Sequence, residues 1–138
     1  MLKIGPTEEA LAAYNSMKLK HNTAYLTFCV QKNKETKEEW IVIEKEAATA
    51  DVGDDYLDAF IADMKGAKTC RFGVVDWNKK LCFVAWSPES AKGKDKMVYA
   101  SIREGFIQTL VGVQIKLQAT DDAELSKEAI VDATKSNV

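Results

Sequence analysis

The chain has 138 residues, of which 46% are hydrophobic and 29% are charged. This length and composition are typical of one soluble globular domain with a single core, and no run approaches the roughly 20 apolar residues that span a bilayer. A formal net charge of -2 at pH 7 provides no overall attraction to nucleic acid or to an anionic membrane, so neither is an expected bulk partner.

Hydrophobic periodicity and turn residues divide the chain into four helices and five strands. Thr7 and Ser126 are suited to cap the first and last helices, Asp54 or Asp55 the second, and Gly66 suits the position after its end. The expected elements are, in chain order, a helix over 8–20, strands over 25–30 and 40–43, a helix over 54–66, strands over 70–75 and 81–86, a long helix ending at Gly112, a strand over 113–117, and a helix after Ser126.

The connections complete this picture of a single domain over 1–138. Polar residues 31–39 predict a hairpin loop, 44–53 a linker, and 76–80 a tight turn between antiparallel strands. Residues 1–6 are expected to be a flexible arm, and the tail 134–138 is expected to be frayed. No internal repeat or low-complexity segment interrupts the pattern.

This order of elements implies an α/β (α+β) fold with a central five-stranded mixed sheet flanked by helices on both faces. In the last strand Val113, Ile115 and Leu117 alternate with polar residues, which predicts one solvated face and a position at or near a sheet edge.

A catalytic constellation is missing from the sequence. The single histidine, His21, lies at a helix-to-strand boundary, where a surface or capping role is expected. The motifs of phosphate-binding loops, dinucleotide-binding folds and serine hydrolases do not occur. The acidic cluster Asp121, Asp122 and Glu124 lacks the ligand spacing and turn glycine of a calcium loop, and therefore predicts a solvated turn. We expect no catalytic residue, no metal site and no cofactor, and the function is assigned to a binding surface.

The three cysteines, Cys29, Cys70 and Cys82, lie within strand-like apolar segments and form no close pair in sequence. They are expected to be reduced core residues of a cytosolic protein. The N-terminal residues contain no apolar stretch long enough for a signal peptide, which also favours a cytoplasmic location.

The long helix after Ser87-Pro88 has two different faces at 100° per residue. One sector about 120° wide is apolar and is expected to face the core: Val98, Tyr99, Ile102, Phe106 and Leu110. The opposite sector is mostly polar: Lys94, Ser101, Glu104 and Gln108, with Lys96 to one side and Met97 as its one large apolar member. An exposed methionine beside two lysines is typical of a contact residue.

The residues of this region are similar to a family signature. From Trp86 the chain reads W-S-P-E-S-A, from Lys94 it reads K-x-K-M-V-Y-A-S, and from Leu110 it reads L-V-G-V-Q-I-K-L-Q-A-T-D-D-A-E-L-S. Near the front, A-Y-N-S-M-K-L from Ala13 resembles the first helix of the same family. The chain is thereby identified as a member of the ADF/cofilin family, whose ADF-homology fold has the order of elements given above.

The resemblance implies an actin-binding protein of the cytoplasm and cytoskeleton that binds actin monomers and promotes filament disassembly. In the family, the long helix and the N-terminal arm enter a cleft of the actin subunit, and an acidic pair precedes the last helix. Carried to this chain, the implied monomer-binding residues are Leu2, Lys3, Ile4, Lys94, Lys96, Met97, Ser101, Asp121 and Glu124. The resemblance also implies phosphoinositide binding, for which the candidates are Lys94, Lys96 and Lys116. The protein itself is expected to be a monomer.

Several residues depart from the family pattern. In filament-severing members a longer basic hairpin contacts a second actin subunit, whereas here only Lys79 and Lys80 mark a short turn, and the last helix adds only Lys127 and Lys135. Filament side-binding and severing are therefore expected to be weak. Gly93 is expected to loosen the start of the long helix, and Ile102 replaces a small polar residue after Ser101.

Regulation is expected to differ as well. No serine precedes Ser16, so control by phosphorylation of an N-terminal serine is expected to be absent. Two other readings stay open. One is a coactosin-like protein that binds filaments without disassembling them. The other is a small enzyme with a cysteine nucleophile, which requires a thiol of low pKa.

Overall fold

The structure is a computed structural model, and it describes residues 4–135. Within this range the elements are α1 (Glu8–Lys20), β1 (Thr23–Lys32), β2 (Glu39–Ala48), α2 (Thr49–Val52), α3 (Leu57–Gly66), β3 (Arg71–Trp77), β4 (Lys80–Trp86), α4 (Gly93–Thr109), β5 (Ile115–Ala119) and α5 (Lys127–Lys135).

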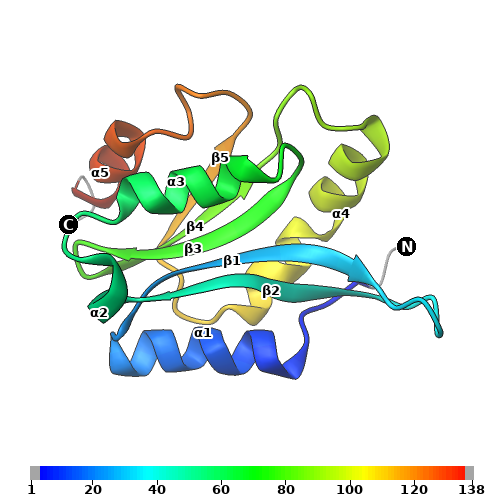
Figure 1. Cartoon of the computed structure of the whole chain (residues 1–138), viewed down its shortest axis with the longest axis horizontal. Coiled ribbons are helices and arrows are strands. Elements are labelled where there is room, and N and C mark those ends of the chain that lie inside the picture. The colour runs from blue at the N-terminus through cyan, green and yellow to red at the C-terminus, as the bar shows by residue number, and fades with distance from the viewer. Residues whose placement is uncertain (1–3, 136–138) are drawn as a thin grey trace.

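The five strands form one sheet in the order β2-β1-β3-β4-β5 (Figure 1). The pairs β1–β2, β1–β3 and β3–β4 are antiparallel, and β4–β5 is parallel. The predicted five-stranded mixed sheet is therefore confirmed, and β5 occupies an edge as its alternating pattern indicated.

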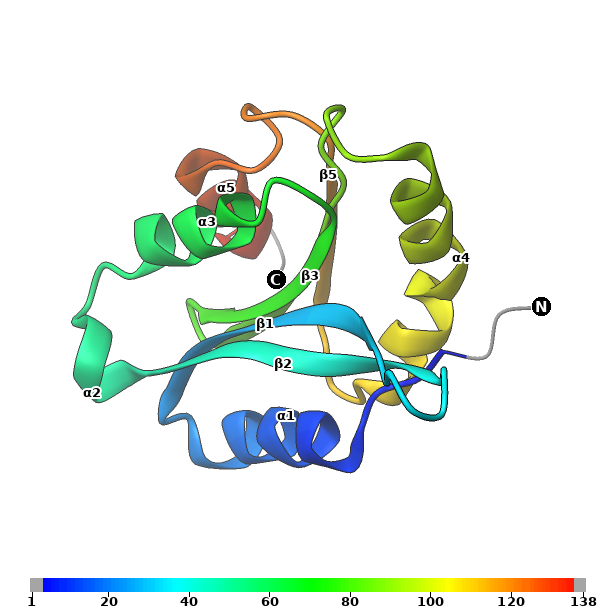
Figure 2. The same cartoon turned by 45° about the vertical axis from the view of Figure 1, so that its right-hand side comes forward.

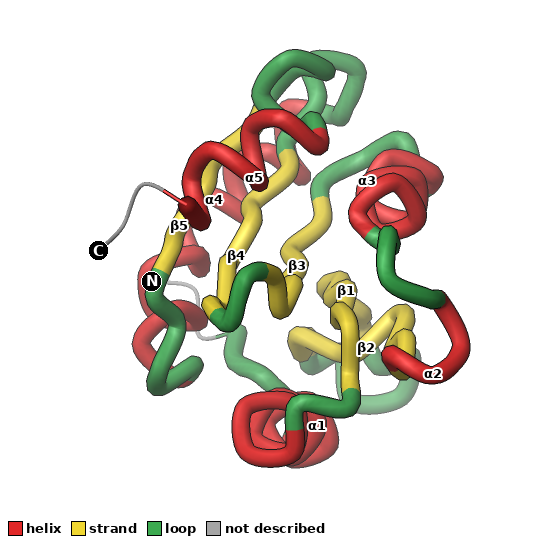
Figure 3. The backbone as a smooth tube through the Cα atoms, turned by 90° about the vertical axis from the view of Figure 1, so that its left-hand side faces the viewer, coloured by secondary structure: helices red, strands yellow, loops and turns green. Residues whose placement is uncertain are grey.

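Helices cover both faces of this sheet, as the views in Figures 2 and 3 show. A hydrophobic core lies on each face, between the helices and the strands. On one face, residues of α1 and α4 pack with β-strand residues such as Leu26, Phe72 and Phe83. On the other face, residues of α3 and α5 pack with Tyr25 and Val75. No described helix combines the length and the apolarity needed to cross a membrane.

The sequence prediction for residues 44–53 is wrong. Residues 44–48 continue β2, and 49–52 form the short helix α2, so the structure has one more helix than expected. The polar stretch stays extended because its backbone pairs with β1, from Lys45 opposite Thr27 to Ala48 opposite Thr23, with one register shift between Tyr25 and Thr23. Backbone pairing of this kind does not require apolar side chains, and hydrophobic periodicity does not report it.

The helix ends agree with the prediction at three places. Thr7 caps α1 by accepting a hydrogen bond from the Ala10 N–H at 3.1 Å, and Ser126 accepts one from the Ala129 N–H at 3.2 Å. His21 ends α1 in the left-handed conformation, with φ of 55°, and its N–H donates to the Met17 carbonyl.

The predicted ends of α3 are wrong. Its N-cap is Tyr56, without a side-chain cap bond, and Gly66 is its last residue rather than the residue beyond its end. Asp55 instead accepts a hydrogen bond from Lys127 Nζ at 2.7 Å. The aspartate therefore links the start of α3 to α5, a partner that is far away in the sequence.

Both ends of the described chain are held more firmly than expected. The Thr7 N–H donates to the Ile41 carbonyl at 3.0 Å, and the Ile41 N–H donates to the Gly5 carbonyl at 2.8 Å, so the arm pairs with the edge of β2. At the other end Thr134 is buried within α5, and its hydroxyl donates to the Ile130 carbonyl at 2.9 Å. Residues 1–3 and 136–138 lie outside the described residues.

Thr27 provides a test of the packing in the middle of the sheet. Its side chain is fully buried on β1, and its Oγ1 has no hydrogen-bond partner among residues 4–135. A buried hydroxyl without a partner loses its hydration and gains nothing in return. We expect Thr27→Val to raise the free energy of unfolding by about 1 kcal/mol. Urea-induced unfolding measures the change, and a variant less stable than the wild type would show that the hydroxyl has a stabilising role.

Candidate functional site

The long helix α4 is fixed on the sheet by an apolar stripe. Tyr99, Ile102 and Phe106 are buried, Leu110 follows at the C-cap, and Val98 is half-buried, as the spacing predicted. Ile107 is also buried, which the sequence analysis missed because this residue lies outside the predicted apolar sector. Aromatic packing is extensive here, and the Phe106 ring centroid lies 5.1 Å from that of Phe28 and 5.4 Å from that of Phe72.

Two departures from the family pattern have little effect on the exposed face. Ile102 is only 4% exposed, so this substitution belongs to the core and does not alter the exposed face. Gly93 is the first residue of α4, where a Cβ would meet no atom within 4 Å. The penalty for glycine in a helix interior therefore does not apply at this position.

The outward face of α4 carries an apolar side chain between two cations. Met97 is 72% exposed, and Ser101 lies one turn further along, also exposed, with its hydroxyl donating to the Val98 carbonyl at 2.9 Å. Lys94 is exposed on the flank toward β1 and β2. Lys96 is half-buried on the flank toward β5, and its Nζ donates to the Glu89 carbonyl at 2.9 Å. The structure thus places Met97 and Ser101 on an exposed ridge of α4, with Lys94 and Lys96 on the two opposite flanks of this ridge.

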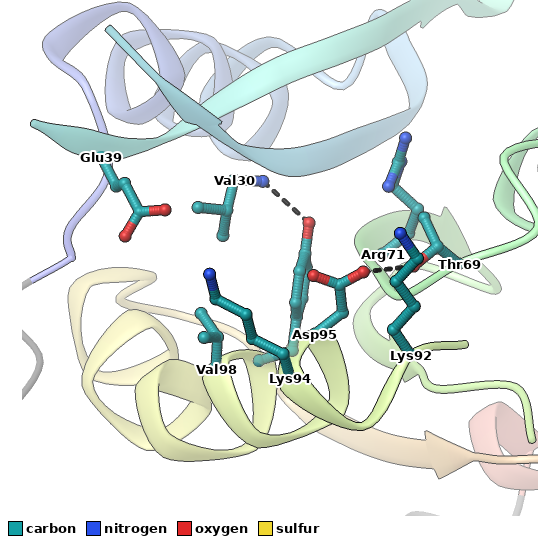
Figure 4. Close-up of a pocket in the computed structure, with 9 residues that line it drawn as sticks. Val30, Glu39, Thr69, Arg71, Lys92, Lys94, Asp95 and Val98 are labelled. Carbon is teal, nitrogen blue, oxygen red and sulfur yellow. Dashed lines mark hydrogen bonds between the residues drawn. The ribbon is translucent and has the colours of Figure 1, made fainter. Parts of the chain in front are cut away.

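A cavity of about 390 Å³ lies beside Lys94, between α4 and the adjacent ends of β1, β2 and β3. Figure 4 shows Lys94 reaching from α4 toward Val30 and Glu39 on its far wall. Arg71 lines another wall and is engaged by Glu44, with Nε–Oε1 and Nη2–Oε2 distances of 2.9 and 3.0 Å. Acidic and basic side chains are mixed in this cavity, so it presents no uniform charge to a ligand.

The turn after β5 holds the predicted acidic pair through hydrogen bonds from groups within the turn. Glu124 accepts from the Thr120 hydroxyl at 2.7 Å and from the Thr120 N–H at 2.8 Å. Asp121 accepts from the Glu124 N–H at 2.9 Å. Both carboxylates are exposed, and the neighbouring Asp122 pairs with Lys65 at 2.9 Å. The carboxylates therefore shape the turn as well as giving it negative charge.

Lowering the pH is expected to loosen this turn. The hydrogen bonds from the Thr120 hydroxyl and N–H stabilise the charged carboxylate and hold the pKa of Glu124 below its usual value. A lowered pKa gives stabilisation that is present above the unfolded pKa of about 4.3 and is lost as the pH falls through the folded pKa. We expect the Thr120 amide resonance to titrate at a lower pH than is usual for a glutamate, and the titration to vanish in Glu124→Gln. A Thr120 resonance that moves equally in both proteins would contradict this coupling.

The N-terminal arm contributes one described residue to the candidate site. Ile4 is half-buried and packs against the core that α1 and α4 share. Leu2 and Lys3 lie outside the described residues. The implied role of Ile4 in binding actin stays a prediction.

The predicted filament-binding residues lie at the opposite end of the sheet from the start of α4. The β3–β4 connection consists of Asn78 and Lys79 alone, both with positive φ (55° and 62°), between the paired residues Trp77 and Lys80. This is the two-residue hairpin geometry that matches the twist of its strands. No basic extension projects from it.

Most of the cations at this end are engaged within the molecule. Lys80 Nζ donates to the Thr134 carbonyl at the end of α5. Lys127 pairs with Asp55 at 2.7 Å, and Lys135 lies 3.4 Å from Asp132. Lys79 is the exposed cation of the turn. The structure therefore separates these four lysines from the α4 ridge and assigns three of them intramolecular contacts.

The thiols do not have the properties of a nucleophile. Burial raises the pKa of all three cysteines, and that of Cys82 to about 12, whereas a nucleophilic cysteine requires a lowered pKa. His21 contacts Asp76 rather than a thiol, with Nδ1 and Oδ2 3.2 Å apart. Among residues 4–135 no group of three His, Cys, Asp or Glu side chains is arranged to hold a metal ion.

Comparison with known proteins agrees with the motif and with the fold. A family model described as "Cofilin/tropomyosin-type actin-binding protein" matches residues 3–135. Cofilin of Cryptococcus neoformans is 31% identical over 137 residues, which cover 92% of each chain. Actophorin of Acanthamoeba castellanii is 29% identical over 146 aligned positions, which cover 100% of this chain and 99% of that protein.

The similarity extends to solved structures. The crystal structure of Streptomyces griseoflavus cofilin matches with a TM-score of 0.79 at 31% identity, covering 96% of this chain and all of that one. Coactosin of Entamoeba histolytica matches with a TM-score of 0.65 at 18% identity, a level that shows the shared fold alone. The chain therefore belongs to the ADF/cofilin family of actin-binding proteins, as the motifs around α4 indicated.

Proposed function

We propose that this protein binds monomeric actin through the ridge of α4 and promotes the disassembly of actin filaments. The observation that carries the proposal is Met97, a large apolar side chain 72% exposed on a polar helix face. Such a residue gains free energy when a partner covers it, and interface anchors of this kind supply much of the affinity. The family assignment makes actin the partner, and it describes a binding protein rather than an enzyme.

The charges around Met97 fit an acidic partner such as actin. Lys94 and Lys96 flank the methionine and provide rim contacts that steer association, whereas Met97 provides the buried contact. Asp121 and Glu124 add a second polar contact from the turn beyond β5, and residues before Ile4 add the arm. A protein with this role belongs to the cytoplasm and its actin cytoskeleton, and it acts as a monomer.

We infer that the second, filament-specific contact is weak. The β3–β4 turn has only two residues, and of the four candidate lysines three already contact groups of the same chain. Using these lysines on a filament requires breaking the intramolecular contacts, which offsets part of the gain. Severing, which depends on contact with a second actin subunit, is expected to be weak for the same reason.

Phosphoinositide binding stays a prediction. Lys94 and Lys96 lie on opposite flanks of α4, and Lys116 is on β5. A single headgroup can therefore meet Lys96 and Lys116 together more readily than all three cations.

Co-sedimentation with preassembled actin filaments tests the proposal, because the pellet and supernatant report both partners. We expect actin to move into the supernatant while little of this protein enters the pellet. A matched variant in which Asn78-Lys79 is replaced by a longer basic hairpin is expected to pellet more strongly. Near one-to-one pelleting of the wild type without loss of filaments would support the coactosin-like alternative. If the distribution of neither protein between pellet and supernatant changes, the result contradicts actin binding itself.

A further inference from the structure

A second cavity lies on the other flank of α4, between this helix and the strands β4 and β5. It has a volume of about 110 Å³. Its apolar part is formed by Phe72, Ala85, Tyr99 and Ala100. Its polar part contains the two cations Lys96 and Arg103 together with Ser87, Gln118 and Thr120, and no acidic side chain lines it. This distinguishes it from the mixed-charge cavity beside Lys94.

The two cations of this cavity are poorly neutralised. Lys96 Nζ donates to a backbone carbonyl, that of Glu89. Arg103 lies with its Nε 3.7 Å from Glu104 Oε1, and the Glu104 side chain is 70% exposed. Within residues 4–135 this is the one carboxylate within 4 Å of either cation. A carboxylate that entered between Lys96 and Arg103 would therefore form charge-assisted hydrogen bonds that the protein does not make by itself.

The neighbouring strand β5 offers an unpaired edge beside the cavity. β5 pairs with β4 on one side and is the last strand of the sheet. Ile115 and Ala119 pack into the core beneath α3 and α5, so the alternate residues Lys116 and Gln118 point to the face that carries α4. A chain segment paired with β5 would place every second side chain on that same face, next to Gln118 and the cavity.

We propose that the groove between α4 and β5 binds an extended acidic peptide segment of a partner protein. The backbone of the segment pairs with the open edge of β5, and one of its Asp or Glu carboxylates enters the cavity between Lys96 and Arg103. Charge complementarity selects this occupant, because the groove presents Lys96, Arg103 and Lys116 and its cavity has no acidic lining. The volume of about 110 Å³ accommodates one side chain rather than a larger ligand.

This site is distinct from the exposed ridge of Met97, although both use Lys96. Its partner and the actin subunit therefore compete for that lysine. The proposal does not depend on actin binding, because the binding of a peptide to this protein can be measured without actin present.

A fluorescein-labelled hexapeptide of alternating valine and glutamate is a suitable probe, with fluorescence anisotropy as the measurement. We expect saturable binding to the full chain and none by the matched peptide of valine and lysine. Arg103→Gln is expected to weaken binding about tenfold, the effect of one charge-assisted contact. Lys34→Gln removes the same charge from an exposed loop and is expected to leave binding unchanged. Unfolding curves of both variants verify that they fold.

Two further arms separate the proposal from its alternatives. Gln118→Glu puts a carboxylate beside the cavity and is expected to repel the acidic peptide, while N-methylation of alternate peptide amides is expected to abolish strand pairing. The proposal is overturned if Arg103→Gln binds as the wild type does. It is also overturned if free glutamate competes as strongly as the peptide, or if only phosphoinositide-containing vesicles bind.

Discussion

Met97→Ala is expected to weaken the binding of actin monomers roughly thirtyfold, because truncating an interface anchor typically costs about 2 kcal/mol. The side chain is 72% exposed in the free protein, so its removal leaves the core intact. We therefore expect the thermal unfolding midpoint to change little, as is typical of substitutions at exposed positions. Fluorescence titration of labelled monomeric actin measures the affinity, and circular dichroism measures the unfolding.

Gln108→Ala is the matched control for this experiment. Gln108 is also exposed on α4, three turns beyond Met97, and it offers no comparable apolar surface. Its truncation is expected to change the affinity by less than threefold, which is below about 0.7 kcal/mol. If both variants bind as the wild type does, the ridge of α4 is not the anchor of the complex. If both lose affinity equally, the loss does not come from a methionine anchor.

Phe106→Ala is expected to lower the free energy of unfolding by about 3–5 kcal/mol. The ring is 1% exposed and contacts Phe28, Phe72 and Phe83, with centroid distances of 5.1, 5.4 and 5.9 Å. Its removal leaves a cavity where α4 is attached to the sheet, and the close-packed neighbours on three strands cannot fill it. This is a large part of the stability of a domain of this size. Urea-induced unfolding at 25 °C measures it.

Phe106→Leu separates the loss of volume from the loss of helix attachment. Leucine fills part of the space, and we expect it to cost about half as much as alanine. The same two variants also test how the core supports the site, because actin affinity is expected to decrease in the same order even though no exposed residue has changed. An alanine variant that loses less than about 1 kcal/mol would show that other contacts hold α4 in place.

Contacts from the N-terminal helix also hold the far end of α4. The Tyr14 hydroxyl donates to the Val111 carbonyl at 2.8 Å, and Lys18 Nζ donates to the same oxygen at 2.9 Å. Burial raises the pKa of Tyr14 to about 12, so the phenol stays a donor throughout the physiological range. The helix that carries the candidate site is thus clamped at its C-terminal end by residues nearly 100 positions earlier in the chain.

The sequence by itself determined the family, the type of most elements and the two faces of α4. These features are local, because an apolar stripe at helical spacing or a run of β-branched residues reports geometry within one element. The core positions Tyr99, Ile102 and Phe106 and the exposure of Met97 follow directly from this periodicity. The short β3–β4 turn was also readable, because the two apolar runs leave too few residues between them for a longer hairpin.

Only the tertiary structure decided which partner each polar group has. In the structure Lys80 donates a hydrogen bond to the end of α5, and Lys127 forms an ion pair with Asp55. Lys94 and Lys96 lie on opposite flanks of one helix. The tertiary structure also extended β2 through residues 44–48 by pairing them with β1. The physical reason is that hydrogen bonds and ion pairs are short-ranged and directional, so they depend on which distant segments the hydrophobic core brings together.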